Sequence, residues 1–150
     1  MSKIKVVMAK AHEGQREDPD IQREIQDVQK FFDQNDFAFE KETLYFVILR
    51  GLNLQIERKL RLAGAFVNKT GLPIEGFRAD MKLNVKSDVQ AQFAEVHLEI
   101  DDNFLGRLEP DEAIVLHIDI PAEGLDPAKQ IYGATELAGA LENLELLVKN

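Results

Sequence analysis

The sequence predicts a mainly β protein, an antiparallel β-sandwich with an amphipathic helix before it. Two observations lead to this fold class. From residue 44 onward, apolar and polar residues alternate in segments separated by Gly, Pro, Asn and Asp, as in half-buried strands joined by turns. Before residue 40, the apolar residues instead recur every three or four positions, which is the period of a helix. We therefore divide the 150 residues into an N-terminal helical extension, 1–40, and a β-sandwich domain, 41–150.

The N-terminal helix is indicated by its start and by one apolar stripe. Asp18 can cap the first turn, and Pro19 suits the first helical position because the N–H that it lacks has no intrahelical partner there. The stripe follows at spacings of four, three and four residues and consists of Ile21, Ile25, Val28 and Phe32. Two interpretations stay open: the stripe packs against the sandwich of the same chain, or it binds a partner.

Strands are expected where the alternation is regular. Residues 44–49 form a continuous apolar run, and alternation follows from Leu52 to Phe66. Arg58 interrupts this pattern where an apolar residue is due, which predicts a turn or a bulge near residues 57–59. Further strands are expected over 77–85, 94–100 and 114–120.

The last segment of the chain fits two structures. Leu144, Leu146 and Val148 alternate as in a strand, whereas a helix over 135–148 would place Leu137, Leu141, Leu144 and Val148 on one face. Periodicity alone does not separate these alternatives. In either case the chain has six or seven strands and no parallel βαβ alternation, which is typical of a β-sandwich.

The stretch EIDDNFLGRLEPDEA, residues 99–113, resembles the calcium loop of an EF-hand. Asp101 and Glu112 would take its first and last positions, but Leu105 stands where an oxygen ligand is due. Both flanking segments alternate with the period of a strand, whereas an EF-hand needs two helices. We therefore predict a connection between two strands, with Leu105 and Leu108 anchored in the core. The alternative is a looser calcium site formed by Asp101, Asp102 and Asp111.

Histidines and carboxylates occur together on two of the expected strands. Glu95, His97 and Glu99 share one face of a strand, and His117 shares a face with Asp119. If the two strands were neighbours, these side chains would converge as a zinc site or a general base requires. The favoured interpretation is a solvated polar sheet face with no metal. The alternative is a small metal-binding protein or a metal-dependent enzyme that uses His97, Glu99, His117 and Asp119.

Charge and composition argue against several classes of partner. The net charge is −9 at pH 7, so nucleic acids and anionic membranes are unfavourable partners. The longest apolar run, residues 44–49, is far shorter than the ~20 residues of a membrane span. The start of the chain has no recognisable signal peptide, so we expect a cytoplasmic location for the chain as written. The cell envelope is the alternative if a signal has been removed.

No catalytic motif is recognisable in the sequence. The chain has no cysteine, no P-loop, no dinucleotide-binding glycine motif and no GxSxG motif. We therefore expect neither an enzyme nor a cofactor. A basic strand face near the middle of the chain is either solvated surface or a contact surface, and consists of Arg58, Lys59 and Arg61.

Residues 60–120 contain LRLAGAFVNKTGLPIEGFRADMKL, then AQFAEVHLEI, then LGRLEPDEAIVLHIDIP. This succession resembles small bacterial immunoglobulin-like modules of the SLAP and FxLYD type. The matching residues are Gly64, Phe66, Asn68, Thr70, Ala91, Phe93, Leu108 and Pro110. The resemblance implies an immunoglobulin-like antiparallel β-sandwich and an accessory role in binding or assembly, linked to secretion or the cell envelope.

These observations together predict a non-catalytic protein–protein interaction or assembly accessory module. A protein partner is expected at the helix stripe (Ile21, Ile25, Val28 and Phe32) or at the basic strand face (Arg58, Lys59 and Arg61). Self-association through an exposed strand edge is a further expectation that the sequence leaves open.

Overall fold

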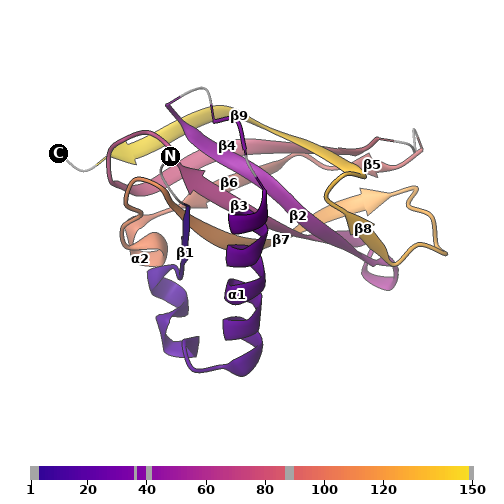
Figure 1. Ribbon diagram of the computed structural model, residues 1–150. Coiled ribbons are helices and arrows are strands. Elements are labelled where there is room, and N and C mark those ends of the chain that lie inside the picture. Colours follow the sequence, from indigo (N-terminus) through magenta and orange to yellow (C-terminus); the bar gives the residue numbers. More distant parts are fainter. Residues whose placement is uncertain (1–3, 36, 40–41, 87–89, 149–150) are drawn as a thin grey trace.

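The computed structural model describes residues 4–35, 37–39, 42–86 and 90–148 of the chain. Two β-sheets pack against each other, and one long helix lies against the larger sheet (Figure 1). The larger sheet has the strand order β1-β7-β3-β2-β8, with β5 also paired to β7. The smaller sheet has the order β6-β4-β9. The mainly β, sandwich-like fold predicted from the sequence is therefore confirmed.

The described strands are β1 (Lys5–Val7), β2 (Leu44–Leu54), β3 (Lys59–Asn68), β4 (Ile74–Val85), β5 (Gln92–Phe93), β6 (Val96–Ile100), β7 (Glu112–Glu123), β8 (Ile131–Gly133) and β9 (Leu137–Val148). The described helices are η1 (Lys10–Gln15), α1 (Pro19–Gln34), η2 (Gln55–Glu57) and α2 (Asp102–Leu105), of which η1 and η2 are 3₁₀ helices.

The main apolar core lies between the two sheets. Phe66 of β3 contacts Phe46 of β2 and Phe77 of β4, with ring centroids 5.1 Å and 5.0 Å apart, so aromatic contacts link the sheets. Other side chains that are almost completely inaccessible to solvent come from both sheets and include Leu60, Leu62, Met81, Ile114 and Ile120. Burial of this apolar surface is the main stabilising contribution to the fold.

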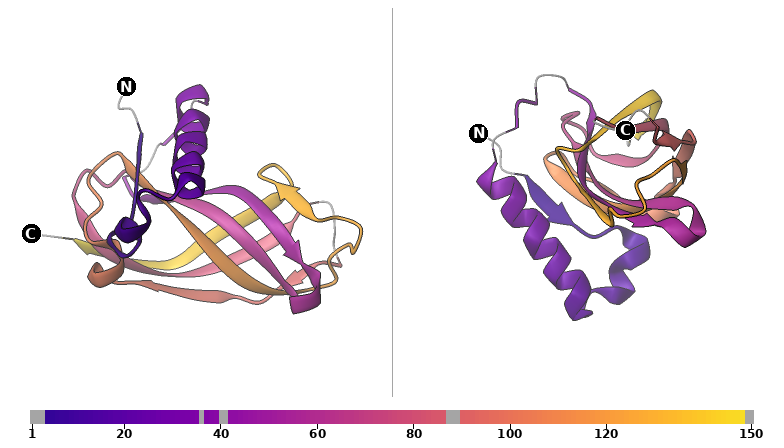
Figure 2. Two further views of the ribbon diagram at one scale, coloured as in Figure 1. Left: turned by 90° about the horizontal axis from the view of Figure 1, so that it is seen from below. Right: turned by 90° about the vertical axis from the view of Figure 1, so that its right-hand side faces the viewer.

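The larger sheet is also covered on its outer face. Residues Leu62 to Asn68 of β3 are all buried, because alternate side chains face the core and α1. Figure 2 shows α1 on the side of the larger sheet that faces away from the smaller sheet. Val28 and Phe32 of α1 are buried there against Ala65, Val67 and Ala113 of the sheet.

The start of α1 agrees with the sequence prediction. The Asp18 carboxylate accepts a hydrogen bond from the Asp20 N–H at 2.9 Å, and Pro19 takes the first helical position. One feature of this region was not predicted: the short strand β1 pairs in parallel with β7. The Gln29 amide of α1 holds β1 through two bonds of 2.8 Å, because it accepts from the Val6 N–H and donates to the Ile4 carbonyl.

The structure decides several alternatives that the sequence left open. The C-terminal segment is a strand, β9, and pairs with β4. The interruption at Arg58 is the turn between η2 and β3. Residues 99–113 connect β6 to β7 through the single turn α2, as predicted. Leu105 and Leu108 are 2% and 0% exposed and anchor this connection in the core.

Candidate functional site

Three adjoining pockets lie at the end of the sandwich that contains η2 and β8. Their volumes are about 670, 350 and 420 Å³. The first two share Asn53 and Gln55, and the second and third share Arg58, Ala122 and Glu123. We call the surface formed by these three pockets the end groove. Its walls come from the end of β2, from η2, from the end of β7 and from the segment that leads to β8.

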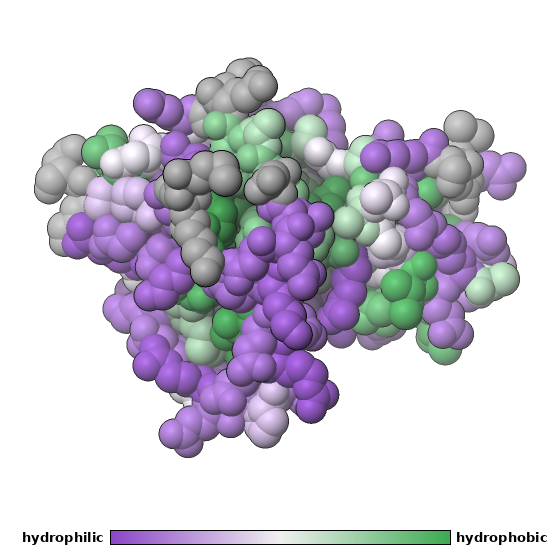
Figure 3. All heavy atoms as spheres, viewed as in Figure 1, coloured by the Kyte–Doolittle hydropathy of each residue, from purple (hydrophilic) through white to green (hydrophobic). Residues whose placement is uncertain are grey.

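One part of the end groove exposes large aliphatic side chains. Leu52 and Ile131 are paired residues of β2 and β8 and are 36% and 60% exposed, and Ile56 of η2 is 99% exposed. Figure 3 shows an apolar patch at this end of the molecule, over β8 and η2. Scattered exposed aliphatic residues are ordinary, but a group of them around a concave surface is typical of an interaction site.

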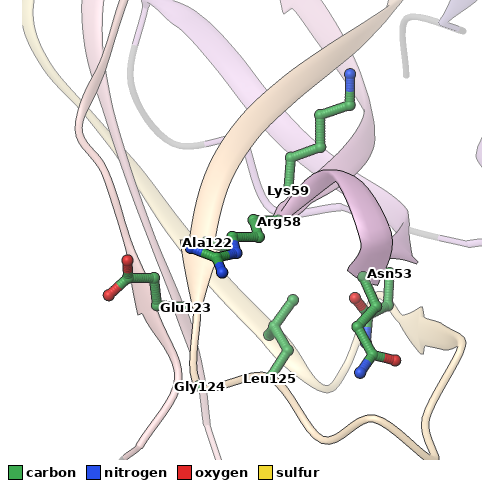
Figure 4. A pocket seen from close by; sticks show the side chains of 8 residues that line it. Asn53, Arg58, Lys59, Ala122, Glu123, Gly124 and Leu125 are labelled. Carbon is green, nitrogen blue, oxygen red and sulfur yellow. The ribbon is translucent and has the colours of Figure 1, made fainter.

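Arg58 lies between two of the pockets, in an unusual backbone conformation. Its φ is 54° and its ψ is 48°, which is the left-handed region. Two hydrogen bonds fix this turn: the Arg58 N–H donates to the Gln55 carbonyl at 3.1 Å, and the Ala122 N–H donates to the Arg58 carbonyl at 3.0 Å. Figure 4 shows the Arg58 side chain directed over Ala122, with Glu123 on one side and Leu125 on the other.

The neighbouring basic side chains are neutralised, whereas Arg58 is not. Lys59 and Arg61 both bind the Asp119 carboxylate, at 2.9 Å and 2.8 Å. Hydrogen bonds from Arg61 and then Lys59 hold the pKa of Asp119 far below its usual range. Within the described part of the chain, Arg58 forms no ion pair, and neither does Glu123, which lines the same two pockets. Counting only partners among the described residues, one unpaired cation and one unpaired anion therefore line the end groove.

Asn53 fixes the wall of the groove that leads to β8. Its side-chain amide donates to the carbonyls of Asp126 at 3.2 Å and Lys129 at 3.0 Å, and its backbone N–H donates to Gln130 at 2.8 Å. Its Oδ1 atom is buried and has no hydrogen-bond partner among the described residues. The groove is thus bounded by a loop that one side chain holds in place.

Most of the helix stripe packs against the larger sheet of the same chain. Val28 and Phe32 are buried, and Ile25 packs against the same cluster. Ile21 and Ile25 line a separate pocket of about 290 Å³ between α1, η1, α2 and β7. Ile25, Val28 and Phe32 therefore pack against the sandwich of the same chain, and Val28 and Phe32 are not accessible to a partner on this surface.

The residues of the metal hypothesis are separated between the two sheets. His97 and Glu99 lie on β6 of the smaller sheet, whereas His117 and Asp119 lie on β7 of the larger one. The two strands are not neighbours, so the geometric condition for that hypothesis is not met. Across residues 4–35, 37–39, 42–86 and 90–148, no group of three or more His, Asp or Glu side chains could hold a metal ion.

Each of the two histidines instead has a carboxylate partner of its own. His97 Nδ1 lies 2.8 Å from Asp80 Oδ1 of β4, which raises the pKa of His97. This pair belongs to a face of cross-strand ion pairs that also includes Arg78 with Glu99 and Lys82 with Glu142. The smaller sheet thus has the solvated polar face that the sequence favoured.

His117 forms its pair with the N-terminal helix. Its Nε2 lies 2.9 Å from Glu24 Oε1, at the wall of the pocket beside α1. This hydrogen bond lowers the pKa of Glu24, as does the Arg50 guanidinium 3.7 Å away, while partial burial opposes the shift. The sequence did not single out Glu24, because nothing in its spacing predicts a contact with a residue 93 positions later.

The acids proposed for a looser calcium site have structural partners. The Asp101 carboxylate caps α2 by accepting from the Phe104 N–H at 3.0 Å. The Asp111 carboxylate binds the Lys69 ammonium at 2.5 Å. Asp102 occupies the first turn of α2. These contacts are those of a strand connection and do not form a cation cage.

The sequence pattern did not predict the aliphatic part of the end groove. The alternation from Leu52 to Phe66 predicts that Leu52 and Ile56 face the interior, whereas both side chains are exposed in the structure. The signal that could have corrected this is Arg58, because the break in alternation there implies that the preceding residues leave the strand. Ile131 lies in a segment for which no strand was predicted.

The comparisons with known proteins identify no relative: no family model, no curated protein and no solved structure matches the chain. Fold and site together define a β-sandwich protein with an apolar and charged groove at one end.

None of the helices in the described ranges is long and apolar enough to span a membrane.

Proposed function

We propose that this protein is a non-catalytic protein–protein interaction or assembly accessory module that binds a protein partner at the end groove. The observation that carries the proposal is the group of exposed aliphatic side chains there, Ile56 above all, whose side chain is 99% exposed. Burial of such a side chain by a partner contributes roughly 1.5–3 kcal/mol to binding. Partner-binding surfaces commonly combine a few such anchors with polar residues around them.

The resemblance to immunoglobulin-like modules of the SLAP and FxLYD type supports an accessory role in assembly. Its matching residues are turn and core positions, so it concerns the fold and leaves the binding surface to be assigned. Arg58 and Lys59 of the basic strand face line the proposed surface. Of the two, only Arg58 has no acidic partner among the described residues, because Lys59, like Arg61, is bound to Asp119. A link to secretion or the cell envelope belongs to the same proposal.

Site-specific photo-crosslinking in cells of the source organism tests the proposal. A photoreactive phenylalanine analogue replaces Ile56 in one variant and Leu72 in the other. Leu72 is a matched control, because it is an exposed aliphatic residue, 53% exposed, in the turn at the opposite end of β3. We expect one discrete adduct from position 56 and none from position 72.

A second substitution shows whether the adduct depends on the groove. Ile131→Asp places a charge within the apolar patch and should abolish the adduct at position 56, while the melting temperature stays unchanged because Ile131 is exposed. Equal adducts from positions 56 and 72, or an adduct that persists in the Ile131→Asp variant, would contradict the proposed function.

A further inference from the structure

We propose that the pocket between α1, η1, α2 and β7 binds a small, uncharged and largely apolar molecule of the phenol class, whose hydroxyl group donates a hydrogen bond to His117. This pocket is separate from the end groove, so the inference does not rest on the proposed function. Three observations carry it: the apolar side chains that line the pocket, the hydrogen bond between Glu24 and His117 at its wall, and its volume of about 290 Å³.

The apolar lining of this pocket comes from elements that are far apart in the sequence. Ile21 and Ile25 belong to α1, Phe104 to α2, and Val115 to β7. Each of these four side chains is half-buried, whereas the other two residues of the helix stripe are buried. The first half of the stripe thus lines a cavity, and its apolar surface is available for a ligand to cover.

The pair of Glu24 and His117 determines which hydrogen-bonding group the pocket offers. An ionised carboxylate only accepts hydrogen bonds, and the lowered pKa of Glu24 favours its ionised form, so the proton of the 2.9 Å bond lies on Nε2 of His117. In a neutral imidazole, the other nitrogen then carries a lone pair and accepts. His117 Nδ1 has no hydrogen-bond partner among the described residues. The pair therefore presents one acceptor, to which a ligand's hydroxyl group can donate.

The partners of Glu24 argue against a charged ligand. One carboxylate oxygen of Glu24 binds His117, and the other lies 3.7 Å from the Arg50 guanidinium. A ligand's ammonium group would lose its water in an apolar pocket whose acid already has two partners, and a ligand's carboxylate would be repelled by Glu24. An uncharged hydrogen-bond donor avoids both costs.

The size of the pocket and its aromatic wall favour a single substituted ring. An apolar cavity of about 150 Å³ holds benzene. A pocket of about 290 Å³ therefore has room for one ring with short substituents. His12 of η1 and Phe104 of α2 both line it, and their rings meet edge to face with centroids 5.1 Å apart. An aromatic ligand can add a further edge-to-face or offset contact there.

Four para-substituted methylbenzenes of similar size test the ligand class. They are para-cresol, which has a hydroxyl donor, para-xylene, which has none, and the charged para-toluate and para-methylbenzylammonium. Each is titrated into the full-length chain at about pH 8, where ordinary imidazole groups are neutral, and protein NMR spectra follow binding up to the solubility of the compound. We expect para-cresol to bind about fivefold more tightly than para-xylene, as one hydrogen bond implies, and more tightly than either ion.

Two matched substitutions assign the binding site. Ile21→Phe places a larger side chain at the pocket and should weaken binding of para-cresol and para-xylene about tenfold, as loss of most of the apolar contact implies. Ile56→Phe is the control, because it makes the same substitution at an exposed aliphatic residue of the end groove. It should leave the binding of all four compounds unchanged.

The imidazole nitrogen resonances test the role of the pair. Para-cresol should shift the Nδ1 resonance of His117 more than para-xylene does, because only the hydroxyl group donates to that nitrogen. Glu24→Gln removes the carboxylate that fixes the proton on Nε2, so the preference for para-cresol should be lost while the affinity for para-xylene stays unchanged. His117→Phe, which removes the acceptor and keeps a ring, should also remove the preference. A merely structural role of Glu24 predicts an equal loss of affinity for both compounds.

Several results would overturn the inference. It is wrong if para-cresol and para-xylene bind equally, if either ion binds more tightly than para-cresol, or if none of the compounds binds. It is also wrong if Ile56→Phe weakens binding and Ile21→Phe does not, because the ligand would then occupy the end groove. The photo-crosslink at position 56 tests the proposed function independently, since no described residue lines both this pocket and the end groove.

Discussion

At the scale of single residues, the pair of Glu24 and His117 makes stability dependent on pH. The pKa of Glu24 is lowered in the folded protein, mainly by its hydrogen bond to His117. A carboxylate with a depressed pKa contributes stability above its unfolded pKa and loses that contribution as pH falls through the folded pKa. We therefore expect Glu24→Gln to be less stable than wild type at pH 7 and to lose less stability between about pH 5 and pH 3.

Thermal melts across this pH range check the prediction. Glu13→Gln is the control, since Glu13 is an exposed acid of η1. This variant should lose stability at low pH as wild type does. If the melting temperatures of wild type and Glu24→Gln fell equally over this pH range, the pair would not couple protonation to folding.

A second residue-scale prediction concerns Gly64 of β3. A Cβ atom at this position would lie 2.4 Å from Cε1 of Phe46, whose ring stacks on Phe66 in the core. Gly64→Ala should therefore force Phe46 to move and cost about 1–3 kcal/mol, as overpacking of a core does. Chemical denaturation measures this loss, and Gly14→Ala is the control, because a Cβ at Gly14 would meet no atom within 4 Å. An unchanged midpoint for Gly64→Ala would show that the ring adapts without cost.

At the scale of elements, α1 is held on the sheet by a few large side chains. Phe32 is buried against the outer face of the larger sheet and contacts the rings of Phe31 and Phe37. Phe32→Ala should destabilise the protein by about 3–5 kcal/mol, because it leaves a cavity under the helix. Phe31→Ala is the matched control, because it makes the same substitution at a position that is not fully buried. It should lower the free energy of unfolding by less. Equal denaturation midpoints for the two variants would mean that α1 does not depend on this contact.

Sequence reasoning succeeded for elements whose own period specifies them. The stripe of α1 and the alternation of β4 and β7 depend on residues close together in the chain, so local pattern was sufficient. It failed where distant segments decide. β1 is only three residues long and depends on Gln29, and the pairing partners of β6 and β7 are set by the order of strands in two sheets. Neither the formation of β1 nor the pairing partners of β6 and β7 can be predicted from the spacing of apolar residues.

The same distinction explains how much of the candidate site was predictable. Arg58 could be singled out because it breaks an alternating pattern, and that break does mark a turn at the groove. Lys59 and Arg61 could not be separated from it, because their neutralisation depends on Asp119 of β7, the strand next to β3. Ile131 joins the patch only because β8 pairs with β2.

At the scale of the whole molecule, the helix and the sandwich should unfold as one cooperative unit. The outer face of the larger sheet exposes Ala65, Val67 and Ala113 unless α1 covers it, and β1 of the same N-terminal segment belongs to that sheet. Separation of the helix from the sandwich would therefore expose apolar surface on both, and cooperative unfolding is usual for single domains of this size.

The two tyrosines lie on opposite faces of the larger sheet, so their fluorescence can follow each face separately. Tyr132 is buried in the core between the sheets, and Tyr45 packs in the cluster under α1. Because the chain has no tryptophan, the fluorescence of Tyr45→Phe reports the inner core alone and that of Tyr132→Phe reports the helix-covered side alone. In each variant, we expect the fluorescence transition to coincide with the transition followed by far-ultraviolet circular dichroism. A transition at lower temperature seen only through Tyr45 would show that α1 detaches first, and that residues 1–40 behave as an extension separate from the sandwich.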